Sequence, residues 1–187
     1  ACNTRSWTPL KLASGVGALS SVTKLLECKS DVHAKAQQDF TALHMAAAQG
    51  HAKVVNVLCQ GRADANLRTH EGWTALHTAV QSGNGEVAKQ LCVMRGDMEA
   101  KDMRGFTPMH MAAAGYRVEV LLVLLQRGAN LDSQNLESQT PLHLSATTGN
   151  LRAAAALIER RAALQARSKH GATPLHTAAW HGHGVVV

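Results

Sequence analysis

The chain has 187 residues, of which 45% are hydrophobic and only 3% aromatic, and its formal net charge is +6. Its longest aliphatic run, Val120 to Leu125, is far shorter than the ~20 apolar residues that a membrane-spanning helix needs. The basic balance raises nucleic acid or acidic proteins as partners without deciding between them.

One short stretch recurs along the chain. Its copies begin at Thr8 (TPLKLAS), Thr41 (TALHMAA), Thr74 (TALHTAV), Thr107 (TPMHMAA), Thr140 (TPLHLSA) and Thr173 (TPLHTAA). Each threonine follows the previous one by 33 residues, without an insertion. This period predicts an array of repeated structural units, each burying its surface against its neighbours, in place of a domain with a single core.

Each repeat predicts two helices. The threonine can cap the first backbone amides of a helix, and Pro108 suits the first helical position. Nine residues after the threonine, a glycine predicts a left-handed turn that ends this helix; these are Gly17, Gly50, Gly83, Gly149 and Gly182, whereas the fourth repeat has Gly115 one residue early. Residues 52–59 show helical apolar spacing for a second helix. Turn residues such as 102–105 then lead to the next threonine.

Both ends of the chain fall inside a repeat. Residues 1–7 align with the ends of the later linkers, and residues 185–187 align with the middle of a second helix. Neither end carries the polar cap that a repeat array needs. We therefore expect the array to be a piece of a longer protein.

These motifs resemble the ankyrin repeat: TPLH, then G-H, a leucine pair, G-A-D/N and a D-x-x-G turn. The resemblance covers essentially the whole chain, with repeats at 3–35, 36–68, 69–101, 102–134, 135–167 and a partial sixth at 168–187. It implies an all-α solenoid of stacked antiparallel helix pairs, with β-hairpin loops projecting from one edge. We call residues 36–40, 69–73, 102–106, 135–139 and 168–172 the second to sixth finger loops.

The chain departs from the family pattern at glycines that the resemblance places in left-handed backbone. Before the A-D/N pair only Gly128 is kept, and the other positions hold Lys29, Arg62, Arg95 and Arg161. Asp39 and Ser138 replace the finger glycine found at Gly72, Gly105 and Gly171. A side chain in this conformation costs roughly 1 kcal/mol. We expect a less stable array than an ideal one, with irregular second and fifth fingers.

Five histidines, one in each of repeats two to six, invite a metal or catalytic interpretation: His44, His77, His110, His143 and His176. Ligands of one zinc ion lie within ~4 Å of each other, whereas stacked helices are roughly 10 Å apart. The resemblance instead implies hydrogen bonds within and between repeats. The glycines at 15–17 lack the strand and third glycine of a phosphate loop, and no metalloprotease or nucleophile-elbow motif occurs. We expect no enzyme activity, metal or cofactor.

Four cysteines, Cys2, Cys28, Cys59 and Cys92, form no CxxC pair. We interpret them as small buried hydrophobic residues in a reducing compartment, which predicts an intracellular protein, cytoplasmic, nuclear or both. By resemblance only, Asn66 matches an asparagine that is hydroxylated in some family members.

The residue before each threonine is aromatic in the first four repeats: Trp7, Phe40, Trp73 and Phe106, followed by Gln139 and Ala172. The resemblance places it at the finger base, beside the concave face. These rings are either interface anchors or packing for the neighbouring finger. Basic residues in or near the fingers outnumber acidic ones, which indicates either a solvated edge or a site for an acidic or phosphorylated protein segment. The candidate contact surface comprises Trp7, Phe40, Trp73 and Phe106, with Arg68, His70, Met103, Arg104 and Gln81 around them.

Three functions follow from these patterns. The first is a non-catalytic scaffold that binds a partner protein through finger loops and the concave face of the inner helices. The second is a regulatory or docking segment of a larger multidomain protein, such as a kinase, channel or ubiquitin-ligase adaptor. The third, nucleic-acid binding, is disfavoured by the acids interspersed among the basic residues.

Overall fold

The first helices of the repeats lie side by side, and so do the second helices, in each of two units of the chain. The structure is a computed structural model that describes residues 7–115 and 117–184. The units comprise Ala1–Asp97 and Met98–Val187. We call the first helix of each repeat an inner helix and the second an outer helix.

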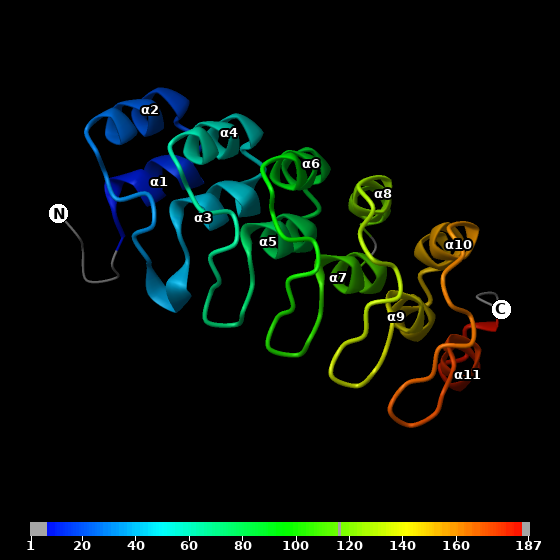
Figure 1. Ribbon diagram of the computed structural model, residues 1–187. Helices are drawn as coiled ribbons and strands as arrows, with labels where there is room; N and C mark the ends of the chain where they lie inside the picture. Colours follow the sequence, from blue (N-terminus) through cyan, green and yellow to red (C-terminus); the bar gives the residue numbers. More distant parts are fainter. Residues whose placement is uncertain (1–6, 116, 185–187) are drawn as a thin grey trace. The chain divides into compact units, whose positions relative to one another are not determined.

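Unit 1 holds the first three helix pairs (Figure 1). The inner helices α1 (Pro9–Gly15), α3 (Ala42–Gln49) and α5 (Ala75–Ser82) pack against one another in order. The outer helices α2 (Leu19–Glu27), α4 (Ala52–Gln60) and α6 (Gly85–Val93) form a second row in the same order. A 3-10 helix, η1 (Gln37–Asp39), lies in the second finger loop.

Unit 2 repeats this arrangement. Its inner helices α7 (Pro108–Ala114), α9 (Pro141–Thr148) and α11 (Pro174–Trp180) pack in order, and the outer helices α8 (Val118–Gln126) and α10 (Leu151–Glu159) also pack together. The described residues therefore form an all-α ankyrin-type array within each unit. They include no β-strand, so the expected hairpins are present as loops closed by turns.

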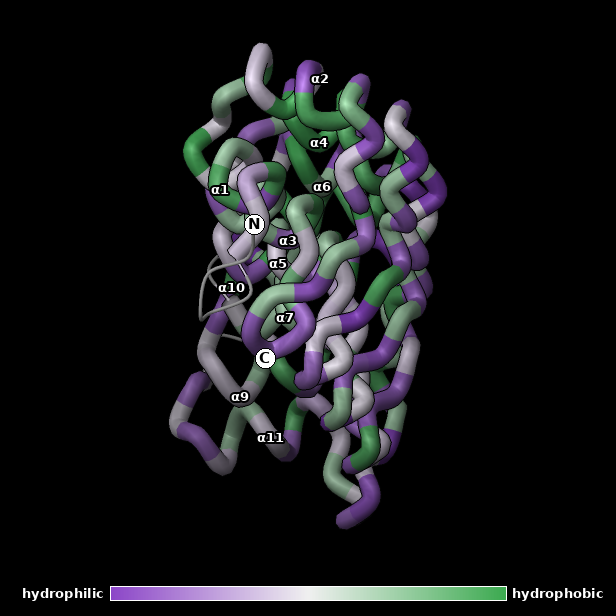
Figure 2. The backbone as a smooth tube through the Cα atoms, turned by 90° about the vertical axis from the view of Figure 1, so that its left-hand side faces the viewer, coloured by the Kyte–Doolittle hydropathy of each residue, from purple (hydrophilic) through white to green (hydrophobic). Residues whose placement is uncertain are grey.

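Leucine, valine and alanine make up most of the core. Leu43, Leu76 and Ala79 are buried on the inner helices of unit 1, as are Met109 and Leu142 on those of unit 2. Small alanines let neighbouring inner helices approach closely. Figure 2 shows further hydrophobic stretches, in green, on the outer helices α4 and α6. Within each unit, each repeat thus buries apolar surface against its neighbour, as the 33-residue period predicted.

The predicted helix ends are confirmed. Thr74, Thr107 and Thr173 cap their helices through their side chains. Gly17, Gly50, Gly83, Gly149 and Gly182 all have φ between 70° and 78°, the left-handed region that glycine enters without a Cβ penalty. The fourth repeat differs, because Gly115 has φ −86°, and its next residue lies outside the described ranges.

The left-handed side chains are also confirmed. Lys29, Arg62, Arg95 and Arg161 have φ between 56° and 66°. In the second finger both Gln38 (59°) and Asp39 (63°) are left-handed, one residue more than a glycine-containing finger needs. The expected irregularity of the fifth finger is wrong. Ser138 is left-handed, yet its N–H bonds to the Asn135 carbonyl at 3.0 Å, as Gly105 bonds to Asp102 at 2.9 Å.

Candidate protein-binding surface

Three buried histidines connect their repeat to the finger base of the next repeat in the same unit. The Nδ1 atom of His44 lies 2.9 Å from Thr41 Oγ1, and its Nε2 lies 3.1 Å from the carbonyl oxygen of Trp73. A carbonyl oxygen only accepts, so Nε2 carries the proton and Nδ1 accepts. His110 and His143 bond in the same way to the carbonyls of Gln139 and Ala172, at 2.9 and 3.0 Å. The role implied by the resemblance, bonding within and between repeats, is confirmed for these histidines.

Burial keeps these imidazoles neutral. It lowers the pKa of His44 to about 4 and that of His110 to about 4, against the opposing effect of their hydrogen bonds to backbone carbonyls. Burial also lowers the pKa of His143. Nδ1 also accepts the threonine backbone N–H, at 3.3 Å from Thr41, 3.2 Å from Thr107 and 3.1 Å from Thr140. A neutral ring is required here because a protonated Nδ1 could no longer accept this bond.

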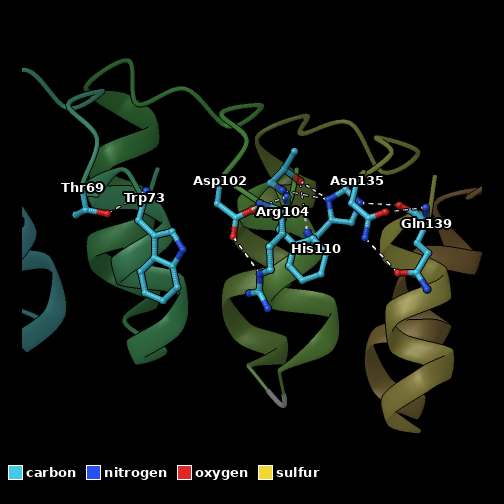
Figure 3. A network of polar contacts seen from close by, with 9 residues as sticks. Thr69, Trp73, Asp102, Arg104, His110, Asn135 and Gln139 are labelled. Atoms are coloured by element: carbon cyan, nitrogen blue, oxygen red, sulfur yellow. Dashed lines mark hydrogen bonds and ion pairs between the residues drawn. The ribbon is translucent and has the colours of Figure 1, made fainter. Parts of the chain in front are cut away.

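A polar side chain closes the turn in the third, fourth and fifth fingers. Asp102 Oδ1 accepts the backbone N–H groups of Arg104 and Phe106, at 2.9 and 2.8 Å. Asn135 Oδ1 does the same for Glu137 and Gln139, at 2.9 and 2.8 Å, and the hydroxyl of Thr69 accepts from Trp73 N–H at 3.1 Å. Figure 3 shows these bonds as dashed lines. The repeat pattern alone did not reveal this role, although an acceptor side chain three residues before the finger glycine position is a recognisable signal for it.

Neighbouring fingers are joined by backbone hydrogen bonds. Within unit 1, His70 N–H donates to the Gln38 carbonyl at 3.0 Å. Within unit 2, Leu136 N–H donates to the Arg104 carbonyl at 3.2 Å, and Lys169 N–H to Glu137 at 2.9 Å. A Cβ on Gly105 would lie 2.8 Å from Leu136 N. The fingers of unit 2 are therefore in close backbone contact and hold their side chains at fixed spacing.

A second row of acceptors lies in the loops after the outer helices. Asn66 Oδ1 accepts from Asp97 N–H at 2.7 Å, and its amide donates to the Arg95 carbonyl at 3.2 Å. The matching side chains in other repeats also accept a backbone N–H 31 residues later: His33 from Asp64, Glu99 from Asn130 and Asp132 from Ala163. The sequence showed no fixed residue here, yet all four side chains present an acceptor.

The four aromatic candidates are half-buried: Trp7, Phe40, Trp73 and Phe106. The Phe40 ring centroid lies 5.6 Å from that of His44 with the planes tilted by 59°, whereas Phe106 stacks on His110 at 5.7 Å and 7°. The Arg104 guanidinium lies 4.6 Å from the Phe106 centroid. These two phenylalanines therefore contact the histidine of their own repeat and retain part of their surface.

The remaining candidates are exposed: Arg68, His70, Met103 and Arg104 in the loops and Gln81 on α5. The structure brings three candidates together, because Met103, Arg104 and Phe106 line one hollow of about 310 Å³. The fifth finger contributes the other lining residues, none of which was a candidate from the sequence: Asn135, Leu136, Glu137 and Gln139. Trp7, Phe40, Arg68, His70, Trp73 and Gln81 belong to unit 1 and do not line this hollow. We call this hollow the finger groove.

The described part of the chain contains neither a candidate metal site nor a candidate membrane-spanning helix. There, no three side chains of His, Cys, Asp or Glu lie together in a way that could hold a metal ion. No helix of residues 7–115 and 117–184 is long and apolar enough to cross a membrane. Cys28 is exposed and Cys59 and Cys92 are half-buried, so the interpretation of these three as buried residues was wrong.

The helix pairs, histidine bonds and turn-closed fingers define a helical repeat protein. A family model described as ankyrin repeats (3 copies) matches residues 10–103, 60–135 and 109–187. The chain therefore belongs to the ankyrin repeat family, whose repeats are generally protein–protein interaction modules and typically non-catalytic. A search of curated proteins gave no match.

Proposed function

We propose that this chain is a non-catalytic, intracellular scaffold that binds a partner protein through its finger loops and the adjoining inner helices. One observation carries this proposal: the same two backbone hydrogen bonds close the second to sixth fingers, while the side chains of the fingers change. The second residue of each finger loop differs from finger to finger. From the second finger to the sixth it is Gln37, His70, Met103, Leu136 and Lys169, all exposed. Fold stability alone does not require this variety, whereas recognition of one partner does.

The fixed finger backbone supports this function energetically. Side-chain acceptors close the turns, and hydrogen bonds join neighbouring fingers within each unit. A surface held in this way loses little conformational entropy on binding. More of the favourable free energy of its contacts with a partner therefore remains as binding affinity.

The charges favour a partner with an acidic or phosphorylated segment. In and beside the fourth to sixth fingers, Asp102 and Glu137 are outnumbered by Lys101, Arg104, Arg167 and Lys169. The Asp102 carboxylate is buried and bonded to backbone amides. An anionic segment would therefore meet a positive rim.

Affinity capture from cell extract with the whole chain tests this function. The test variant combines His70→Ala, Met103→Ala and Arg104→Ala, three exposed finger residues. Its matched control combines Lys89→Ala, Val93→Ala and Arg152→Ala, which are exposed on the outer helices α6 and α10. We expect the finger variant to lose captured proteins that the control retains. Equal capture by both variants contradicts the proposal.

The aromatic candidates need a separate variant, Trp73→Ala with Phe106→Ala. If these rings anchor a partner, capture weakens while circular dichroism shows nearly unchanged helical content. If the double variant unfolds, the rings are structural and leave the proposed surface. The exposed-residue variant above still tests the function in that case.

A further inference from the structure

The finger groove contains an exposed apolar pair that the fold does not require. Met103 and Leu136 occupy the same repeat position in adjacent fingers, and each is 67% exposed. The other described fingers carry Gln37, His70 and Lys169 there. Since polar side chains serve this position elsewhere in the same chain, the two apolar side chains need another explanation. Both line the groove, and Phe106 at the finger base lines it too.

The dimensions of the groove suit part of a peptide. Its volume of about 310 Å³ is at the lower end of the roughly 300–1,000 Å³ range of small-molecule pockets. This space accommodates one or two side chains and is small for a cofactor. An apolar side chain placed between Met103 and Leu136 would remove both from water, the main favourable term in such an association.

The groove is preformed. Leu136 N–H bonds to the Arg104 carbonyl, and the absence of a Cβ on Gly105 allows the two backbones to approach this closely. Asp102 and Asn135 close the two turns from inside. Because both finger backbones are already fixed, binding of a side chain between them requires little ordering of the loops. The loss of conformational entropy that opposes binding is therefore small.

Acidic and basic side chains face each other on both sides of the groove. On one side, the Arg104 side chain is 68% exposed, and its Nε lies 3.8 Å from the buried Asp102 carboxylate. On the other side, Glu137 lies 3.8 Å from both Lys169 Nζ and His170 Nε2. Arg104 is thus the basic residue that lines the groove, and because most of its side chain remains exposed, its guanidinium can contact an incoming carboxylate.

We propose that the finger groove binds a short segment of a partner protein that presents an apolar side chain next to a carboxylate. The apolar side chain lies between Met103 and Leu136, and the carboxylate lies beside Arg104. This inference rests on the proposed function and specifies the chemistry of the partner segment.

Selection of random 12-residue peptides displayed on phage against the whole chain tests the proposal without assuming a sequence. We expect the enriched peptides to place Leu, Ile or Met within two positions of Asp or Glu. The most frequent peptide is then synthesised, labelled, and its dissociation constant measured by fluorescence anisotropy. Absence of enrichment, or enriched peptides without this pair of residue types, overturns the proposal.

Substitutions locate the binding site of that peptide. The double variant Met103→Gln with Leu136→Gln places at both positions the residue type that Gln37 provides in the second finger. It should weaken binding at least about tenfold, the effect of losing one buried aliphatic contact. Arg104→Gln should weaken it about two- to fivefold, as for an exposed ion pair. The matched control, Leu122→Gln with Leu151→Gln, changes exposed leucines on α8 and α10 and should leave binding unchanged. Unaltered affinity in the Met103/Leu136 variant contradicts the assignment.

Another occupant, a second copy of this chain, gives a different result. Sedimentation velocity would then show self-association that the Met103→Gln and Leu136→Gln changes abolish, and the peptide proposal would fail. Its failure remains distinct from failure of the proposed function. If only the peptide proposal fails, the variant with alanine at His70, Met103 and Arg104 still loses captured proteins. If the proposed function fails, this variant captures the same proteins as its control.

Discussion

His44 Nε2 donates a hydrogen bond to the carbonyl oxygen of Trp73, 3.1 Å away and 29 residues later in the chain. The same relationship joins His110 to Gln139 and His143 to Ala172. The histidine holds the backbone of the finger base, so the side chain at that position can differ between repeats without loss of this bond. A constant scaffold residue thus permits variation at the adjoining surface position.

These histidines predict loss of stability in acid. Their native pKa values lie below the unfolded value of about 6.5, at about 4 for His44 and His110. Between these values the unfolded chain binds more protons than the native one, so the free energy of unfolding falls as pH decreases. Each of the two histidines contributes on the order of 3 kcal/mol over this interval.

Urea unfolding between pH 7.5 and pH 4 measures this effect. His44→Gln should reduce the steepness of the pH dependence, because one titrating group is removed, although the variant is less stable at neutral pH. A free energy of unfolding that does not change across this interval would contradict the neutral, buried histidines.

The Asp102 carboxylate predicts a second effect on stability. Asp102→Ala removes the acceptor for two backbone N–H groups of the fourth finger, which should lower the free energy of unfolding by about 1–3 kcal/mol. Asp102→Asn is the control, because Asn135 already performs this role in the next finger with the same geometry. Thermal unfolding should therefore rank wild type and Asp102→Asn together, with Asp102→Ala below both. Equal loss in both variants would mean that the charge, and not the acceptor, stabilises the turn.

The left-handed arginines predict that the array can be stabilised. Arg62 has φ 66°, and Arg62→Gly should raise the free energy of unfolding by about 0.5–1 kcal/mol, since relief of left-handed strain exceeds the added chain entropy. Lys53→Gly, at an exposed position within α4, should instead lower it by about 1 kcal/mol. Urea midpoints compare the two. A decrease for Arg62→Gly would show that the arginine has a stabilising contact larger than the strain.

The sequence was sufficient for features that depend on local backbone chemistry. A threonine, its histidine and a glycine nine residues later define the limits of an inner helix, because capping and left-handed turns involve residues near in sequence. The left-handed state of Arg62 and Arg161 followed from the register of the repeat for the same reason.

Features that depend on contacts between repeats were less accessible. Leu136 gave no signal alone, because its place in the finger groove requires Met103 and Phe106 from the preceding finger. Glu99 and Asn66 share no side-chain type, and only the observed N–H groups that they accept reveal their common role. The position of these residues within the repeat can be read from the sequence, whereas their roles follow only from contacts between repeats.

Close backbone contact beneath the finger groove predicts that the same substitution has different effects at two equivalent glycines. Gly105 and Gly171 occupy the same finger position and share φ 76°. A Cβ on Gly171 meets no atom within 4 Å, whereas a Cβ on Gly105 would lie 2.8 Å from Leu136 N. Gly171→Ala should therefore lower the free energy of unfolding by roughly 1 kcal/mol through backbone strain alone. Gly105→Ala adds a backbone clash, so it should destabilise the chain further and separate Met103 from Leu136. Urea unfolding measures the first difference and anisotropy of the selected peptide the second; equal effects of the two substitutions would show that close packing of these fingers does not hold the groove together.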